Sequence, residues 1–473
     1  MPLTALAFLV IYVVGLCAAL FNPAAGAVLY VLVYHVNPNT QWWGPAVQGL
    51  GPRLSFTVAL ATGLGILIRR PRLEYGARQF PLAYVLALVL ALLAVGSLFW
   101  GVDITPRGQY QAEKILKLMI WIFILLRCVR TPAEYHALIY AWLVGVLYLG
   151  YEAEGGAGIF RQGRLTAGLG GPDFDESSDL AVHLVATLPL VGAAFFMART
   201  WLGKAFTLLT GALAVNMLIM TRTRNALAGL ALVAGSCVLS LPRRYRLKGL
   251  AAIAAGSYLA LQLTDPGWWK RMATIAEYHS DAAATGRIQY WKAALKMVRD
   301  HPFGIGLGNF HHVVMDYIPD LTMERGAHNT IMACLAELGW PGLALFLFFL
   351  AVVLHRLGRV RVAARHLPDM LELRYYRWRT NFHLGWHTVA LRSAILGYLG
   401  CSMFTTRLFS EDFWLLLGLS MCLDNASKYA AALAAEPDGV PAEPQALTEG
   451  SQPLPAPVAD LPPAADPAVP TQP

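Results

Sequence analysis

Charged residues are scarce in this 473-residue sequence: 14% of its residues are Asp, Glu, Lys or Arg, whereas 56% are hydrophobic. Soluble domains carry about 25% charged residues, so this composition argues against a soluble globular fold. Cysteines are also few, and no two of them have the CxxC spacing of a metal site. All six fall in or beside apolar runs, which indicates small buried side chains and no disulfide framework: Cys17, Cys128, Cys237, Cys334, Cys401 and Cys422.

Long apolar runs are abundant instead, and they recur from the N-terminus to about Met421. Runs of about 15–24 residues are typical of a polytopic membrane protein. The first run lacks a basic segment and a cleavage site, so we interpret it as a retained span. We predict an all-α membrane fold with about 12–13 transmembrane helices, near 4–20, 24–36, 54–68, 81–99, 115–126, 134–150, 180–197, 205–220, 225–241, 249–263, 330–354, 387–405 and 412–426.

The net charge of +8 is distributed unevenly along the chain. Short loops rich in Lys and Arg remain in the cytoplasm, so the basic excess indicates topology and contact with anionic membrane lipids, with no nucleic-acid partner. The basic loops are 69–78, 127–130, 199–204, 243–248 and 355–379. The loops predicted to lie outside are 37–53, 100–114, 152–179, 221–224, 264–329 and 406–411.

Two parts of the chain differ from the apolar spans. The membrane domain is predicted to cover residues 1–430, and the Pro/Ala-rich segment 431–473 cannot form a core, so we expect a disordered cytoplasmic tail. The external loop 264–329 is long enough to hold helices of its own. Within it, TGRIQYWKAALKMVRDHPFG predicts a surface helix that Thr285 caps, that starts near Arg287 and that Pro302 ends.

Two arginines lie in the short turn of MTRTRNALAG (220–229). Two spans need about 40 residues, so the apolar stretch 205–241 leaves none for an exposed loop. Arg222 and Arg224 are therefore expected at the outer membrane interface, where planar, permanently charged guanidinium groups suit bidentate binding of phosphate. The alternative is that both side chains reach outward and cap a helical hairpin.

The segment ERGAHNTIMACLAELGWPGLALF places Arg325, His328 and Asn329 at the mouth of an apolar span. A neutral imidazole with a pKa near 6.5 can accept a hydroxyl proton, so His328 is a candidate general base. Asn329 would orient a sugar or cap the following helix, and Arg325 is a candidate substrate-binding cation. All three would alternatively be interfacial polar residues. Glu337, deeper in the span near Pro341, is expected to bond to backbone that a proline kink frees.

Further polar groups lie near two other helix ends. In GGPDFDESSDLAVHL (170–184), Asp179 and His183 share a helical face with Asp175 or Glu176, where they would bind acceptor hydroxyls or form a solvated cap. Arg287 near a helix N-terminus favours an anion, although a lone loop arginine is commonly solvated. We expect neither a metal nor a cofactor, because no strong ligand spacing is present among His311, His312, Asp316 and Asp320.

Together, these segments resemble the O-antigen ligase and O-antigen polymerase superfamily of bacterial envelope glycosyltransferases. The resemblance lies in TRTRNALAGL, TGRIQYWKAALKMVRDHPFGIGLGNF and AHNTIMACLAELGWPGLALFL, and it extends over about residues 160–425. YHVNPNTQWWG (34–44) further resembles the branch described as exosortase-associated O-glycosylation ligases. The chain has Thr-Arg-Asn where the family usually has Ser-Arg-Gly, which leaves open whether Arg222 or Arg224 is the main diphosphate ligand.

The resemblance implies a GT-C-type glycosyltransferase of the bacterial inner membrane, with a large periplasmic loop and no metal or cofactor. Such enzymes transfer a glycan from undecaprenyl diphosphate, with inversion, to a lipid A core, a growing polysaccharide or a protein hydroxyl at the periplasmic face. By match to the family's motifs, Arg224 and Arg287 would stabilise the leaving diphosphate, with Arg222 as a partner. His328 would accept the proton of the acceptor.

Three functions therefore compete. A ligase that acts on a lipid or protein acceptor is the first, and an O-antigen or exopolysaccharide polymerase with the same machinery is the second. A solute transporter or lipid-glycan flippase is the third. Transporters concentrate polar residues at the membrane midplane in paired repeats, whereas here they concentrate at one face and no repeat is present.

Overall fold

The computed structural model describes residues 1–50, 53–69, 81–174, 176–241, 243–275, 282–363, 371–375 and 378–435. Met1–Ala435 form one compact unit, whose described residues contain sixteen α-helices and two small antiparallel hairpins. The predicted all-α membrane class is confirmed. The segment predicted as a tail lies outside the described residues beyond Ala435, so its disorder stays a prediction.

The first half of the unit contains seven helices and one hairpin. The break between the first two helices falls at Asn22, whose side chain accepts a hydrogen bond from the N–H of Ala24 at 3.2 Å, while Pro23 opens the second helix. The elements are α1 (Leu3–Phe21), α2 (Pro23–Val36), the 3-10 turns η1 (Pro38–Thr40) and η2 (Gly44–Leu50), α3 (Leu54–Arg69), α4 (Leu82–Trp100), α5 (Pro106–Cys128), α6 (Pro132–Glu154), β1 (Ile159–Arg161), β2 (Arg164–Ala167) and α7 (Ser177–Met197).

The second half contains nine helices and the other hairpin. The predicted external loop 264–329 holds three of these helices, as expected of a loop of that length. The elements are α8 (Trp201–Thr221), α9 (Asn225–Ser240), α10 (Arg243–Gln262), α11 (Pro266–Ala273), α12 (Ala282–Asp300), α13 (Phe310–Tyr317), α14 (Thr330–Ala363), β3 (Leu371–Tyr375), β4 (Trp378–Phe382), α15 (Leu384–Ser402) and α16 (Glu411–Ala435).

Each of the thirteen predicted spans overlaps one of these helices, although 81–99, 225–241, 249–263 and 387–405 extend past the helix end by one to three residues. By length and composition, five helices among the described residues are long and apolar enough to cross a membrane: α1, α4, α7, α8 and α14. Helices α3 and α9 are apolar but shorter. Other helices carry charged residues at one end, as α10 does in RRYRLK, which lowers their mean hydropathy. The protein is therefore a polytopic membrane protein, and the total of 12–13 spans stays a prediction.

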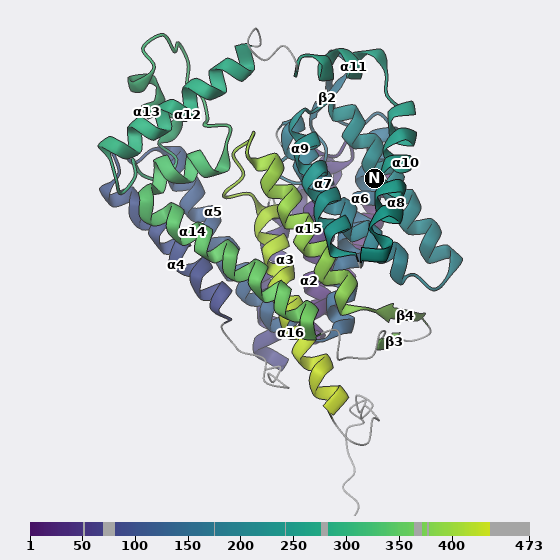
Figure 1. The fold of residues 1–473 in the computed structure, drawn as a ribbon. Helices are drawn as coiled ribbons and strands as arrows, with labels where there is room; N and C mark the ends of the chain where they lie inside the picture. Colours follow the sequence, from purple (N-terminus) through teal and green to yellow (C-terminus); the bar gives the residue numbers. More distant parts are fainter. Residues whose placement is uncertain are drawn as a thin grey trace, which may run out of the picture. The chain divides into compact units, whose positions relative to one another are not determined.

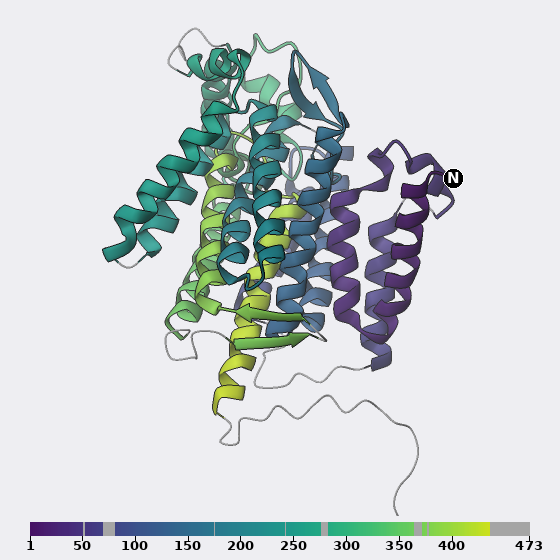
Figure 2. The same ribbon diagram turned by 90° about the vertical axis from the view of Figure 1, so that its right-hand side faces the viewer.

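The long helices run between two ends of the unit (Figure 1). Helices α11, α12 and α13 lie at one end together with the β1–β2 hairpin, and the β3–β4 hairpin lies at the other end (Figures 1 and 2). The first end thus collects two segments predicted to be external, 152–179 and 264–329. The second end holds part of the basic segment 355–379, so the two sets of loops are separated as the charge pattern predicts.

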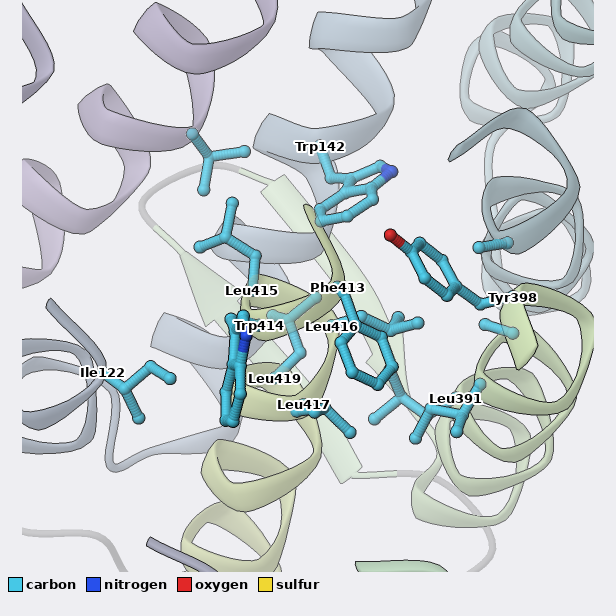
Figure 3. Packing of buried hydrophobic residues seen from close by; sticks show 14 of the residues in the cluster. Ile122, Trp142, Leu391, Tyr398, Phe413, Trp414, Leu415, Leu416, Leu417 and Leu419 are labelled. Atoms are coloured by element: carbon cyan, nitrogen blue, oxygen red, sulfur yellow. The ribbon is translucent and has the colours of Figure 1, made fainter. Parts of the chain in front are cut away.

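Helix α16 lies in the apolar core of the unit (Figure 3). Its segment FWLLLGL is buried on every side, which is typical of a helix surrounded by other helices. The ring of Trp414 stacks on Phe349 of α14, with centroids 5.7 Å apart, and Phe413 stacks on Tyr398 of α15 at 4.9 Å. This packing fixes α14, α15 and α16 against one another, and with them the loops at their ends.

Helix α14 is interrupted at Gly339, whose φ of 67° and ψ of −169° are not helical. An interruption of this kind frees backbone groups that must find other partners inside the protein. The loop after α12 supplies them: the N–H groups of Ile305 and Gly306 donate to the carbonyl oxygens of Ala336 and Glu337 at 2.9 and 3.0 Å. Backbone N–H groups of the predicted external loop thus bond to the carbonyl groups that the kink leaves free.

The same contacts explain the glycines of HPFGIGLGNF. Gly304 has a φ of 91°, and a Cβ atom there would collide with the carbonyl oxygen of Glu337. The carboxylate of Glu337 accepts a hydrogen bond from the N–H of Phe310 at 3.4 Å. Glu337 therefore bonds to backbone, as predicted, but to the backbone at the start of α13 rather than to that of its own helix. The glycine segment is a close-approach loop that ties α12 and α13 to α14.

Helix α12 differs from its prediction in where it begins. It starts at Ala282, so Arg287 lies in its second turn and not at its N-terminus. Ala293, Ala294, Met297 and Val298 of this helix are buried, whereas Ile288 and Leu295 are 40% and 50% exposed. The buried alanines and Met297 pack in one cluster with residues of α13 and α14.

Candidate functional site

A cavity of about 340 Å³ lies among the loops at the α11–α13 end of the unit. Its walls come from the β1–β2 hairpin, the start of α7, the α8–α9 turn, helices α11 and α12, and the loops before α14 and after α15. The residues that line it are Ile159, Arg161, Arg164, Thr166, Ala167, Glu176, Ser177, Ser178, Thr223, Arg224, Asn225, Arg271, Arg287, His328 and Phe404.

The α8–α9 turn sends its two arginines to different places. Arg222 ends α8 in the left-handed conformation, with a φ of 46°, and its guanidinium pairs with the carboxylate of Asp265 at 2.6 Å and donates to the carbonyl oxygen of Gln162 at 3.3 Å. Arg224 lines the cavity and donates a hydrogen bond to the hydroxyl oxygen of Thr274 at 3.0 Å. The structure thus separates the two candidates: Arg224 borders the cavity and Arg222 holds the turn.

The β1–β2 hairpin adds two arginines that the sequence did not indicate. Arg161 and Arg164 pair across a two-residue turn, in which Gln162 and Gly163 have φ values of 53° and 69°, as a type I′ turn requires. The Nε–H of Arg164 donates to the carbonyl oxygen of Thr221 at 2.7 Å, at the C-terminal end of α8. This bond fixes the hairpin beside the turn that carries Arg224.

His328 lies between two fixed neighbours at the cavity wall. The carbonyl oxygen of Ala327 accepts a hydrogen bond from the indole N–H of Trp291 at 3.1 Å. The side-chain oxygen of Asn329 accepts from the N–H groups at the start of α14, at 2.9 and 3.1 Å, so Asn329 caps this helix. His328 itself has a φ of 45°, a sparsely populated conformation for a non-glycine residue that is more frequent at functional sites.

The electrostatic surroundings of His328 favour the neutral ring. Its pKa is lowered from the ordinary value, mainly by burial; the carboxylate of Glu176 acts to raise it, and the cations Arg287 and Arg325 act to lower it further. A histidine whose pKa lies below its usual value is unprotonated at neutral pH. It is then able to accept a proton.

Behind the cavity lies a network of buried charges centred on Arg407, in the loop between α15 and α16. Arg407 is 4% exposed, and its guanidinium contacts the carboxylates of Asp412 at 2.9 Å and Asp179 at 3.3 Å. It also donates to the carbonyl oxygen of Asp173 at 2.6 Å and, at 3.3 Å, to the hydroxyl oxygen of Tyr398. Buried charges of both signs thus compensate one another here.

This network extends to the segments that line the cavity. The backbone N–H of Arg407 donates to the hydroxyl oxygen of Thr330 at 2.9 Å, two residues after His328. The hydroxyl of Thr405, next to the cavity residue Phe404, donates to the carboxylate of Asp179 at 3.3 Å. The network therefore connects the loop after α15 with the starts of α7 and α14.

His183 lies deeper in the same region. It is fully buried, its ring stacks on Trp142 with centroids 4.8 Å apart, and its Nε2 lies 3.2 Å from Nε2 of His35 on α2. Its Nδ1 is 3.6 Å from a carboxylate oxygen of Asp412. Neither His183 nor Asp179 lines the cavity, and both are buried, so neither forms the acceptor site at the outer mouth or the solvated cap that the sequence left open.

Of the eight predicted site residues, the cavity brings together Arg224, Arg287 and His328. Those outside its lining are Arg222, Asn329, Arg325, Asp179 and His183. Sequence reasoning missed Arg161, Arg164 and Arg271. The first two could have been found, because RQGR has the pattern of a tight turn flanked by arginines.

Within the described ranges, no group of three or more His, Cys, Asp and Glu side chains is placed to hold a metal ion. The cavity offers guanidinium groups, hydroxyls, one carboxylate and one imidazole. It is suited to binding an anion next to a proton acceptor.

The arginine-rich cavity at one end of this polytopic membrane protein, with the neutral ring of His328 in its wall, defines a site suited to an anionic substrate next to a proton acceptor. Residues 209–347 match the family model described as O-antigen ligase. This match supports membership of the O-antigen ligase superfamily, which implies ligase-type or polymerase-type glycan transfer at a membrane with a lipid-linked glycan and an acceptor as substrates. No curated protein matches the chain. The matched range contains Arg224, Arg287 and His328, but neither the β1–β2 hairpin nor Arg407.

Proposed function

We propose that this protein is a GT-C-type glycosyltransferase that transfers a glycan from undecaprenyl diphosphate to an acceptor hydroxyl at the periplasmic face of the bacterial inner membrane. The observation that carries the proposal is that Arg224, Arg287 and His328, from three separate segments, line one cavity. Two cations beside a neutral imidazole suit a reaction in which a phosphate leaves while a hydroxyl loses its proton.

In the proposed reaction, the acceptor oxygen attacks the anomeric carbon from the face opposite to the diphosphate. The new glycosidic bond forms as the bond between the anomeric carbon and the diphosphate oxygen breaks, so the configuration inverts. The hydroxyl proton passes to His328. The electron pair of the broken bond leaves with the lipid diphosphate, whose charge Arg224 and Arg287 stabilise.

The other predicted site residues receive supporting roles in this proposal. Arg222 fixes the turn that presents Arg224, through its ion pair with Asp265. Asn329 caps α14 and so fixes the backbone next to His328. Asp179 and His183 support the cavity wall from behind through the Arg407 network, and they do not touch the acceptor.

The acceptor is identified by a transfer assay with the purified protein and a glycan on undecaprenyl diphosphate. A lipid A core, the glycan alone and a serine-containing peptide are offered in parallel, and mass spectrometry follows which one gains the glycan. Transfer to the core or the peptide identifies a ligase and names its acceptor. A longer glycan alone identifies a polymerase. Transport by the reconstituted protein without any transfer overturns the proposal in favour of a transporter.

Variants test the roles of the three residues in the same assay. His328→Ala is expected to abolish transfer while membrane insertion and the melting temperature stay close to those of the wild type. Near-normal turnover of this variant would remove His328 as the base. Activity is also expected to persist in a chelator, and a loss that a divalent cation restores would show that the reaction needs a metal.

The orientation of the cavity is tested by cysteine labelling in cells. Met323 lies in the loop before α14 and is 53% exposed, whereas Tyr245 lies in the predicted cytoplasmic segment 243–248 and is 42% exposed. In a Cys17→Ser background, Met323→Cys is expected to react with a membrane-impermeant maleimide in intact cells, and the matched Tyr245→Cys only after lysis. The reverse pattern would place the cavity on the cytoplasmic side.

A further inference from the structure

The cavity carries more positive charge than its proposed leaving group requires. Its described lining contains five arginines and one glutamate, a formal surplus of four positive charges with His328 neutral. A phosphate diester carries about one negative charge, so a lipid diphosphate bonded at both ends carries about two. Arg224 and Arg287 are enough to balance it. The remaining arginines are Arg161, Arg164 and Arg271.

Among the residues that the structure describes, these three arginines form no ion pair with a carboxylate. The nearby Arg222, in contrast, is paired with Asp265 at 2.6 Å. Arg164 donates its Nε–H to a backbone carbonyl, which leaves the charge of its guanidinium uncompensated. Guanidinium groups gathered in this way repel one another unless an anion lies between them.

Arg164 lies close to the other cavity arginines. Its pKa is lowered from the ordinary value for arginine, first by burial and then by the neighbouring cations Arg271, Arg224 and Arg287, against which Glu176 acts in the opposite direction. Arg164 is also held in place by the tight turn of its hairpin and by its bond to Thr221. The fold therefore holds Arg164 in this position without a ligand.

We propose that Arg161, Arg164 and Arg271 form a second anion subsite, which binds a carboxylate or phosphate group that the donor glycan or the acceptor carries near the reacting atoms. The inference rests on the proposed transferase function and adds a substrate class to it: at least one substrate is acidic beyond the lipid diphosphate. The subsite comes from the β1–β2 hairpin and α11, whereas the reacting groups come from α12, the α8–α9 turn and the loop before α14. The residues that select the substrate are thus different from the residues that take part in the reaction.

The test compares acidic and neutral substrates in the transfer assay. Two donors differ only in the sugar next to the diphosphate, a uronic acid or the corresponding neutral sugar. Two acceptors differ only in one phosphate group. Wild-type protein, Arg161→Gln and Arg164→Gln are measured in nanodiscs of zwitterionic lipid, with Arg299→Gln as a matched control, because Arg299 is an exposed arginine of α12 outside the cavity lining.

If the subsite exists, its loss should weaken the binding of acidic substrates and leave the binding of neutral substrates almost unchanged. For the acidic member of one pair, KM is expected to rise by about tenfold or more in Arg161→Gln and Arg164→Gln, because hydrogen bonds between charged groups are lost. The neutral member and the Arg299→Gln control are expected to change little. The donor pair and the acceptor pair show which substrate carries the anion. Arg161→Gln guards against a folding artefact, since no bond to the rest of the fold depends on its side chain among the described contacts, and Arg164→Lys is expected to recover part of the loss.

Two results would overturn the subsite. The first is that Arg161→Gln changes KM equally for acidic and neutral substrates, or changes KM for neither, while the wild type transfers normally. In that case the proposed function would stand without the subsite. The other is a loss that appears only when anionic phospholipid is added, because the arginines would then bind lipid head groups. Absence of transfer in the wild type with all substrates, in contrast, rejects the proposed function itself.

Discussion

Two regions of this protein use arginine in opposite ways, although they share the same loops. In the network around Arg407, one buried guanidinium meets the carboxylates of Asp412 and Asp179, and its remaining donors bond to backbone and to a tyrosine. In the cavity, the lining that the structure describes holds five arginines and one carboxylate, that of Glu176. A compensated buried charge fixes the loops that surround it, whereas a surplus of charge next to solvent is available to a ligand.

Arg407 and the cavity arginines also differ in their position relative to the cavity. Arg407 connects the loop after α15 to the starts of α7 and α14, so it acts on the walls of the cavity without entering it. The cavity arginines come from separate elements, namely the β1–β2 hairpin, the α8–α9 turn, α11 and α12. We therefore expect substitutions in the network to affect folding first, and substitutions in the cavity to affect catalysis first.

The largest effect is expected for Arg407→Met, which leaves Asp412 and Asp179 buried without a cation. Breaking a buried ion pair by removal of one partner costs about 3–5 kcal/mol. The melting temperature in detergent is expected to fall strongly and the yield of monodisperse protein with it. Arg222→Met is the matched control, since its partner Asp265 is half-exposed and such a pair is worth about 1 kcal/mol or less. Equal, small shifts in both variants would contradict the structural role of Arg407.

The next largest effect is expected for Arg224→Gln, which removes a cation from the cavity. Loss of one group that stabilises developing charge costs about 10²–10³ in rate. The turnover number is expected to fall by this order while the melting temperature changes little, and Arg224→Lys is expected to recover little because a lysine cannot bind phosphate in the same bidentate way. Arg222→Gln is expected to show a smaller loss of rate, and its loss of stability is expected to be about 1 kcal/mol or less. Equal losses of rate would place both arginines at the diphosphate.

A smaller effect is expected at Asn329, which lies between the two regions. Asn329→Ala removes the cap of α14, at a cost of about 1 kcal/mol, and Asn329→Ser is expected to retain most of the stability because serine is also a good cap. Thermal unfolding measures both variants. If Asn329→Ser keeps the stability but loses transfer, Asn329 binds a sugar as well as capping the helix.

The smallest effect concerns the pH dependence of kcat/KM. Because burial and the nearby arginines lower the pKa of His328, the neutral base persists to lower pH, and activity is expected to fall only as pH drops through that lowered pKa. Glu176→Gln removes a carboxylate that raises this pKa, so the acid limb is expected to move to lower pH. Arg325→Gln removes a cation that lowers it, so the limb is expected to move to higher pH. We expect each shift of the acid limb to be a fraction of a pH unit, because the interactions are weak and screened. Shifts of the limb in the opposite directions would exclude His328 as the titrating base.

Much of this architecture follows from local sequence. The apolar runs predict the helices, since a segment of that length and composition has few alternatives in a membrane. The basic loops predict which ends lie together, and the break before Pro23 is evident from the Asn-Pro pair. The α8–α9 turn is predicted because no residues remain for a longer loop. The prediction for α12 was less accurate, because the TGR motif did not show that the helix begins five residues before Arg287, at Ala282.

Site residues were predictable to the extent that their chemistry depends on their own segment. Arg224, Arg287 and His328 lie in motifs with recognisable spacing, and the structure places all three at one cavity. Asp179 and His183 have an equally suitable pattern, yet their partners Arg407 and His35 are far away in the sequence. No local pattern distinguishes a carboxylate that meets a ligand from one that meets a buried arginine.

The sequence by itself determined the class of the protein: a polytopic helical membrane protein with polar residues concentrated at one end, and three residues suited to anion binding and proton transfer. Only the tertiary structure decided which arginine of the α8–α9 turn faces the cavity, because the left-handed conformation of Arg222 directs its side chain to Asp265. The tertiary structure also brought Arg161 and Arg164 to the cavity and Arg407 behind it. These arrangements depend on contacts between segments tens to hundreds of residues apart, which the order of residues in any one segment does not encode.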